Sequence, residues 1–189
     1  MYKRQLAHIP EDRNKMGLIG DMNIKDNIVL KDLEKKRFSK GHGKFLLSKK
    51  ITEYSNQMKE KYDIRCSSIE EQARNLSGGN QQKVVVGKWL ARDSRVVIFD
   101  EPTRGIDVGA KVEIYNLMNE LKKQGIAVMF VSSEMPEVMG IADRIIVMCD
   151  GRITGEVSAR EATQDEILTM ATSFENKSIK ETEGGSKNE

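Results

Sequence analysis

Cysteine and histidine are scarce in this 189-residue sequence, which contains only Cys66, Cys149, His8 and His42. Two cysteines exclude a framework of several disulfides and a cysteine-rich zinc site, and they favour a reducing compartment. Two histidines leave little material for histidine-based catalysis or metal binding. Histidine and cysteine chemistry are therefore poor starting points for a function.

Long apolar runs and an excess of charge of one sign are also missing. The longest fully apolar run covers residues 126–131, which is far too short to cross a bilayer. The 31 Lys and Arg residues nearly balance 29 Asp and Glu residues, so the net charge of +2 gives no case for a nucleic-acid partner. No basic-then-apolar leader opens the chain, so nothing indicates secretion. With 38% hydrophobic and 32% charged residues, the composition describes a solvated globular protein of one domain, or one with a small second domain.

Three regions differ in pattern along the chain. Residues 23–75 are polar, rich in lysine and helix-like, with an interruption at 41–43. Residues 92–174 alternate short β-branched runs with amphipathic segments, which is typical of a parallel α/β core. Residues 175–189 carry seven charges and no aromatic residue, so we expect a disordered tail.

Within the α/β region the elements can be placed one by one. The runs 96–99 and 127–131 predict strands buried on both faces. Between them, a helix closed by Gly125 is predicted from an apolar stripe at Val108, Val112, Tyr115, Met118 and Leu121. Ser133 is expected to cap a short helix, Asp150-Gly151 to join strands 144–149 and 152–157, and Thr163 to cap a last helix.

The run 76–83, Leu-Ser-Gly-Gly-Asn-Gln-Gln-Lys, is the most informative part of the sequence. Gly78 and Gly79 let the backbone approach a ligand, and the helix that follows presents free N–H groups and its positive end to an anion. Ser77 adds a hydroxyl donor, so the group suits a terminal phosphate. The simpler interpretation is a serine cap in a glycine-rich turn. All eight residues together resemble the signature loop of ABC-transporter ATPases, in the form typical of sugar importers.

An acidic pair follows the strand predicted at 96–99. Asp100 and Glu101 lie at its C-terminal end, where ligands bind in open α/β sheets. A solvated acidic strand end is the ordinary alternative. The resemblance implies that Asp100 belongs to the Walker B motif and holds Mg²⁺, and that Glu101 is the catalytic base.

Two further segments fit the same family. Residues 105–107 lie where the family has its D-loop, so the resemblance implies that Asp107 approaches nucleotide, although Asp107 also suits a helix cap. Residues 131–137 resemble the switch region, with Ser133 in the place of the switch histidine. A serine cannot carry the proton or the charge of imidazole, so hydrolysis at the site built on Asp100 and Glu101 is expected to be weakened.

The segment 9–13, Ile-Pro-Glu-Asp-Arg, resembles the Q-loop region, with Glu11 in place of glutamine as in the C-terminal half of double-domain sugar importers. The resemblance implies a role for Glu11 at the nucleotide and its metal, and a nucleotide contact for Gln81. No Walker A motif is present, because the Gly-Lys pairs at 43–44 and 87–88 lack its leading glycine and its Ser or Thr. We therefore expect a C-terminal part of a longer polypeptide, inactive in ATP hydrolysis by itself.

The fold class that the resemblance implies is α/β, a C-terminal fragment of the P-loop NTPase domain of ABC type. We expect residues 1–22 to end the ATPase core with the Q-loop region and residues 23–91 to form a helical subdomain with the signature loop. Residues 92–174 are expected to complete the core with the Walker B, D-loop and switch segments. Residues 175–189 form the expected tail.

The function implied is that of the ATP-hydrolysing subunit of an importer for ribose, galactose or xylose, with ATP and Mg²⁺ as cofactors. Its expected partners are the opposing ATPase half, two permease subunits and, indirectly, an extracytoplasmic binding protein, at the cytoplasmic face of the bacterial inner membrane. Nucleosides or autoinducer-2 are alternative cargoes. A soluble ABC protein without a permease and a non-hydrolysing interaction module are the other hypotheses.

Overall fold

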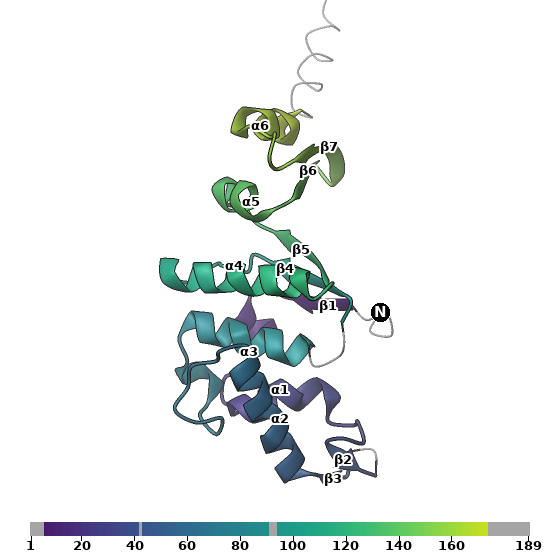
Figure 1. Cartoon of the computed structure of the whole chain (residues 1–189), viewed down its shortest axis with the longest axis vertical. Coiled ribbons are helices and arrows are strands. Elements are labelled where there is room, and N and C mark those ends of the chain that lie inside the picture. The colour runs from purple at the N-terminus through teal and green to yellow at the C-terminus, as the bar shows by residue number, and fades with distance from the viewer. Residues whose placement is uncertain (1–5, 42, 91–93, 174–189) are drawn as a thin grey trace, which may run out of the picture. The chain divides into compact units, whose positions relative to one another are not determined.

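The structure is a computed structural model that describes residues 6–41, 43–90 and 94–173 (Figure 1). The chain divides into two units, and the boundary in the sequence falls between Val131 and Ser132. The tail predicted to be disordered, residues 175–189, lies outside the described residues.

The first unit is built on a parallel sheet in the order β1-β4-β5. Its strands are β1 (Leu6–Ile9), β4 (Val96–Asp100) and β5 (Ala127–Val131), and β4 lies between the other two. The strands predicted at 96–99 and 127–131 are confirmed, and so is the parallel α/β class. In β4, Val97 and Phe99 are fully buried on one face, but Val96 and Ile98 on the other face are only half-buried, so the predicted burial on both faces is wrong for the second face.

The expectation that β5 is buried on both faces is wrong. Its side chains alternate between exposed and half-buried, and Met129 is 52% exposed. The reason is its place in the sheet, because among the described residues β5 pairs only with β4 and forms an edge.

Helices make up most of the remainder of the first unit (Figure 1). The predicted polar, helix-like region contains α1 (Ile24–Val29) and α2 (Ser48–Lys61), and the helix after the glycine pair is α3 (Gly78–Leu90). Between α1 and α2 a two-stranded hairpin that was not predicted spans the interruption, with β2 (Ser39–Lys40) and β3 (Phe45–Leu46). Short helical turns complete the unit at η2 (Arg13–Gly17), η3 (Leu30–Asp32) and η4 (Ala73–Asn75).

Helix α3 lies at the centre of these contacts. It packs against β1, α1 and α4 (Val108–Lys123), and its three consecutive valines, 84–86, are fully buried. Consecutive buried residues cover more than one face of a helix. The sheet, the helical region and α4 are therefore fixed to one another through α3.

The helix predicted over 108–121 is present as α4, but part of its predicted apolar stripe is wrong. Val108 and Val112 are 81% and 52% exposed, whereas the fully buried Ile114 lies with Met118 and Leu121 on the covered face. Steps of three residues fall short of a helical turn by roughly 60° each, so the predicted stripe drifts around the helix. Ile114, Met118 and Leu121 lie within roughly 60° of one another.

The described part of the second unit, residues 132–173, contains two helices and an antiparallel hairpin. These are α5 (Met135–Ile141), β6 (Arg144–Cys149), β7 (Arg152–Ser158) and α6 (Gln164–Thr172). The predicted turn at Asp150 and Gly151 is confirmed, and both residues have positive φ, at 47° and 74°. The unit has its own apolar core around Ile145, Val147 and Ile167.

The two predicted caps in this unit have different outcomes. Thr163 caps α6, because its side chain accepts a hydrogen bond from the Glu166 N–H. The prediction that Ser133 caps α5 is wrong. The N-cap residue of α5 is Glu134, whose N–H donates to the hydroxyl oxygen of Ser132.

Candidate functional site

The acidic pair, Asp100 and Glu101, lies at the carboxyl end of the central strand. Asp100 is the last residue of β4 and is in register with Val131. Glu101 turns the chain away from the sheet with φ at +44°, and its N–H donates to the carbonyl of Val131 at 2.9 Å. A positive φ costs energy in any residue with a side chain, so the packed sheet end holds Glu101 in a strained turn.

The carboxylate of Asp100 is partly open to solvent and lies near an imidazole group. The Nε2 atom of His8 lies 3.9 Å from its Oδ2 atom, and both side chains are partly exposed. The described residues contain no group of three acidic, His or Cys side chains that could hold a metal alone. Mg²⁺ commonly takes only one or two protein carboxylates and completes its shell with water and phosphate. The donor set at Asp100 and Glu101 therefore fits Mg²⁺ bound together with a phosphate ligand.

Glu11 forms an ion pair with Arg104. Glu11 belongs to the segment after β1, and Arg104 to the turn after the acidic pair. The side chain of Arg104 is largely exposed, and that of Glu11 is partly exposed. The structure thus places Glu11 beside the turn that follows Glu101, and the contact joins the ends of two neighbouring strands.

Arg13 joins three separate segments of the first unit. Its Nε atom donates to the Oε1 atom of Gln81 at 3.1 Å, and Nη1 and Nη2 donate to the carbonyls of Arg104 and Gly105 at 3.0 and 3.3 Å. Gln81 is buried, and its amide group donates to the carbonyl of Ala73 at 3.3 Å. The planar guanidinium group thus fixes the start of α3 against the segment that follows the acidic pair.

The two glycines of the signature loop, residues 76–83, allow this close approach. A Cβ atom on Gly78 would lie 2.7 Å from Nη2 of Arg13, and one on Gly79 would lie 2.7 Å from the Cβ atom of Ala110. Such separations are well inside van der Waals contact. Glycine at both positions lets α3 pack directly on Arg13 and on the first turn of α4.

Ser77 precedes α3 and is exposed. Its Oγ atom accepts a hydrogen bond of 3.0 Å from the side-chain amide of Asn80. The Oδ1 atom of Asn80 accepts in turn from the main-chain N–H of Arg65 at 2.8 Å. The hydroxyl of Ser77 is thus linked to a loop that lies outside the helix.

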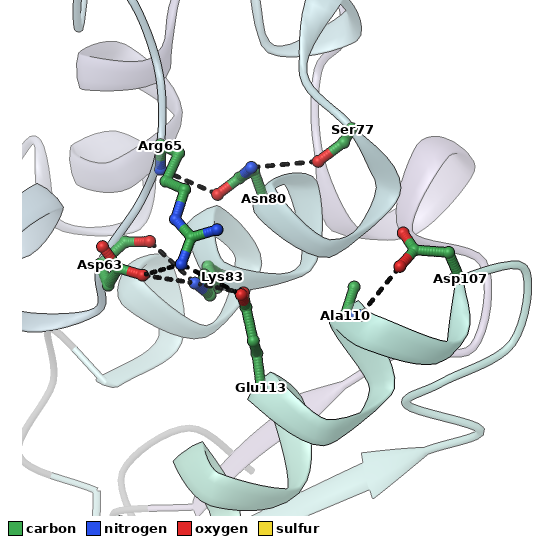
Figure 2. A network of polar contacts seen from close by, with 8 residues as sticks. All are labelled: Asp63, Arg65, Ser77, Asn80, Lys83, Asp107, Ala110 and Glu113. Atoms are coloured by element: carbon green, nitrogen blue, oxygen red, sulfur yellow. Dashed lines mark hydrogen bonds and ion pairs between the residues drawn. The ribbon is translucent and has the colours of Figure 1, made fainter.

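A cluster of four charged side chains lies beside this link (Figure 2). The Nζ atom of Lys83 lies 3.2 Å from the carboxylate of Asp63 and 2.8 Å from that of Glu113. Arg65 pairs with the same two carboxylates, at 3.2 and 3.1 Å. Glu113 belongs to α4 and Lys83 to α3, so the ion cluster Asp63-Arg65-Lys83-Glu113 ties the two helices together.

The positively charged groups of the cluster lower the pKa of Asp63. The hydrogen bond from Lys83 is the main cause that lowers the pKa of Asp63, and the charges of Lys83 and Arg65 act in the same direction. Asp63 has φ at +46°, a conformation that Asp and Asn tolerate better than most residues.

Asp107 begins α4. Its side-chain oxygen accepts from the N–H of Ala110 at 2.9 Å, so the predicted helix cap is confirmed (Figure 2). Through this cap, the segment 105–107 runs directly into the helix that carries Glu113.

Ser133 lies in the second unit, in the exposed segment before α5. Its neighbour Ser132 donates a hydrogen bond to the carboxylate of the buried Glu137. Contacts of Arg104 and Arg13 thus link Glu11 and Gln81 to the turn that follows the acidic pair, and Ser133 is described on its own.

Sequence reasoning missed the residues that hold the site together. Arg13, Asn80 and Lys83 lie inside motifs that the sequence singled out, but their partners Gln81, Arg65 and Glu113 were given no part in these contacts. A charged residue next to a glycine-rich loop suggests a contact that holds the loop in place. The sequence does not identify the partner in that contact.

No described helix is both long and apolar enough to cross a membrane.

Comparison with known proteins identifies the relatives of this chain. The sequence model of a family described as "ABC transporter" matches residues 1–104. The ribose import ATP-binding protein RbsA of Bacillus subtilis (strain 168) is 50% identical over 171 residues, which cover 90% of this chain and 34% of that protein. The xylose import ATP-binding protein XylG of Moorella thermoacetica is 50% identical over 167 residues, or 88% of this chain and 32% of that protein. The chain spans about a third of the length of these relatives.

A solved structure supports the fold. The structure of cbiO1 from Clostridium perfringens, part of the ABC transporter complex cbiONQ, matches with a TM-score of 0.69 at 19% identity. The match covers 90% of this chain and 64% of that one. At this identity the likeness concerns the fold alone.

Proposed function

This chain belongs to the ABC transporter family, and we propose that it forms part of the ATP-binding subunit of an importer for a simple sugar such as ribose or xylose. The observation that carries the proposal is the arrangement around Arg13. One guanidinium group holds the start of the signature helix α3 against the segment that leaves the acidic pair.

The start of α3 would bind a phosphate group of ATP. Ser77 supplies an exposed hydroxyl, and Gly78 and Gly79 carry main-chain N–H groups in the first turn of a 13-residue helix. Free N–H groups and the helix dipole both favour an anion at this end.

The acidic pair would perform the hydrolytic chemistry. Asp100 would hold Mg²⁺, which when bound neutralises charge on the phosphate oxygens. Glu101 would orient a water molecule and accept its proton, and Glu11, Gln81 and Asp107 would be further nucleotide-binding residues. Ser133 cannot supply the positive charge that a histidine would bring, so we expect this site to be weakened.

On this proposal the residues of one chain serve two ATP sites. Ser77, Gly78 and Gly79 face the nucleotide held by an opposing ATPase half, and Asp100 and Glu101 belong to the other site. Closure of the two halves on ATP would drive permease subunits between two access states. An extracytoplasmic binding protein would deliver the sugar, and the ATPase would lie on the cytoplasmic face of the bacterial inner membrane.

The proposal is tested by uptake of labelled ribose and xylose in cells whose only importer for these sugars is the complete transporter. Ser77→Arg is expected to block uptake more severely than Glu101→Gln, because the bulky cation occupies the anion position of the stronger site. Ser48→Arg, an exposed serine at the start of α2, is the matched control and should leave uptake unchanged. A larger loss with Glu101→Gln would reverse the assignment of the two sites. Uptake of nucleosides but of neither sugar would contradict the proposed cargo.

A further inference from the structure

We propose that Asn80 is a positioning residue that directs the hydroxyl hydrogen of Ser77 towards a phosphate oxygen of ATP. The inference rests on the proposed function, because it specifies how Ser77 would take part in phosphate binding. Three contacts carry it, and all are drawn in Figure 2: Arg65 to Asn80, Asn80 to Ser77, and the ion cluster that surrounds Arg65.

The orientation of the Asn80 amide is fixed by its contact with the main chain. The N–H of Arg65 lies 2.8 Å from one terminal atom of the Asn80 side chain. A main-chain N–H can only donate, so that atom is the amide oxygen. The NH₂ group therefore faces Ser77, where it donates to Oγ at 3.0 Å.

This contact determines which hydrogen-bonding group of Ser77 remains available to a ligand. A serine hydroxyl has one hydrogen to donate and accepts through its lone pairs, and here the amide of Asn80 occupies an acceptor direction. The hydrogen therefore points away from Asn80. Donation into an oxygen also strengthens the donor power of its own O–H group. Ser77 is exposed, so this hydrogen is available to a ligand that only accepts, as a fully ionised phosphate does.

The ion cluster explains why the Arg65 N–H stays in place. The guanidinium group of Arg65 lies 3.2 Å from the carboxylate of Asp63 and 3.1 Å from that of Glu113. Both carboxylates also pair with Lys83, whose side chain is only 5% exposed and which donates to the carbonyl of Asp63 at 2.8 Å. The donor that fixes Asn80 is thereby anchored to both α3 and α4.

The test reverses the hydrogen bond between Asn80 and Ser77 without changing the size of the side chain. In Asn80→Asp one carboxylate oxygen still accepts from Arg65, while the other accepts the Ser77 hydrogen instead of donating to Ser77. In the complete ATP-binding protein assembled with its transporter, we expect the KM for ATP to rise about tenfold, as for the loss of one hydrogen bond to a charged group. Asn80→Ala removes the constraint without adding charge, and should raise the KM about threefold.

Two further variants separate positioning from charge and from folding. Asn75→Asp adds the same charge two residues from Ser77 at an exposed position, and its KM should match the wild type. In a Ser77→Ala background, neither Asn80 variant should raise the KM or the dissociation constant of a fluorescent ATP analogue any further, because the group on which Asn80 acts is gone. Thermal unfolding identifies a variant that fails to fold. If Asn80→Asp fails to fold, the test rests on Asn80→Ala.

The outcomes are distinct. An effect of Asn80→Asp that vanishes in the Ser77→Ala background supports the positioning role. An equal effect in that background, or an equal effect of Asn75→Asp, overturns it. If Ser77→Ala weakens ATP binding while both Asn80 variants behave as the wild type, this inference fails and the proposed function stands. If Ser77→Ala itself behaves as the wild type, the proposed phosphate contact is wrong.

Discussion

The Nε atom of Arg13 donates to the side-chain oxygen of Gln81 at 3.1 Å, although 68 positions separate the two residues in sequence. The other two nitrogens of the same group reach the carbonyls of Arg104 and Gly105. A planar group bonded on three sides leaves its partners little freedom to shift independently. The loop after β1, the start of α3 and the segment 104–105 are therefore expected to move together when nucleotide binds.

The first prediction concerns the geometry of this group rather than its charge. Arg13→Lys keeps the positive charge, but one ammonium group cannot reach three acceptors spread around a plane. Losing two hydrogen bonds at about 1 kcal/mol each should lower the free energy of unfolding by about 2 kcal/mol. Urea denaturation of the purified protein measures the change.

Arg74→Lys is the matched control for this substitution. The guanidinium group of Arg74 pairs with the exposed carboxylate of Asp21, and an exposed ion pair contributes about 0–1 kcal/mol. We expect a loss below about 0.5 kcal/mol. Equal losses for Arg13→Lys and Arg74→Lys would show that the three-way contact of Arg13 adds nothing.

The second prediction tests the close approach of α3 and α4. Gly79→Ala would place a methyl group 2.7 Å from the Cβ atom of Ala110, so one helix must move. Overpacking of this kind costs about 1–3 kcal/mol, which thermal unfolding would detect as a lower Tm.

A second substitution should relieve this clash. Ala110→Gly removes the opposing methyl group, although glycine inside a helix costs about 1 kcal/mol by itself. The double variant should therefore be at least as stable as Gly79→Ala, and clearly more stable than the sum of the two single changes predicts. Simple additivity would contradict the role of this contact.

Local patterns in the sequence were enough to place several elements. A run of β-branched residues located β4, the Asp-Gly pair located the turn between β6 and β7, and Thr163 located the start of α6. Each of these signals acts through neighbours a few residues away. The signature loop and the acidic pair are also continuous segments of sequence, so their order along the chain was sufficient to indicate the family.

The features that were predicted wrongly, or not at all, depend on distant parts of the chain. Whether β5 is central or at an edge is decided by which strands pair with it, and its composition is the same in both cases. The covered face of α4 is decided by where α3 and β5 press on it, which a stripe of apolar residues does not specify. The contact of Arg13 with Arg104 spans 91 positions, and nothing local predicts it.

The third prediction follows from the lowered pKa of Asp63. The hydrogen bond and charge of Lys83 favour the ionised form in the folded protein, so the folded pKa lies below the ordinary aspartate value of 3.8. A carboxylate with a lowered pKa contributes stability above 3.8, and that contribution is lost as pH falls through the folded pKa. Because Asp63 is largely exposed, we expect less than about 1 kcal/mol.

Asp63→Asn isolates this charge, since asparagine also tolerates the positive φ at this position. The variant should unfold at a lower temperature than the wild type at pH 7, and the difference should shrink as the pH is lowered below 3.8. Thermal unfolding across this range checks the sign. A difference that is independent of pH would mean that the charge of Asp63 does not contribute.

The last prediction is an order of stability within the ion cluster. Lys83 is 5% exposed, whereas the side chains of Asp63 and Glu113 are 66% and 35% exposed. Removing the carboxylate of Glu113 leaves the buried ammonium group of Lys83 with less negative charge beside it, which lowers the free energy of unfolding. Removing the ammonium group itself leaves carboxylates that water can reach. Glu113→Gln should therefore destabilise the protein more than Lys83→Met, a replacement that also keeps most of the apolar volume of the lysine stem.

Chemical denaturation of the two single variants and the double variant measures the order. In the double variant the penalty of Glu113→Gln should largely disappear, because no buried charge remains to be compensated. If Lys83→Met proved the more damaging change, the attraction within the cluster would outweigh the cost of burying the charge, and the cluster would stabilise the contact between α3 and α4 directly.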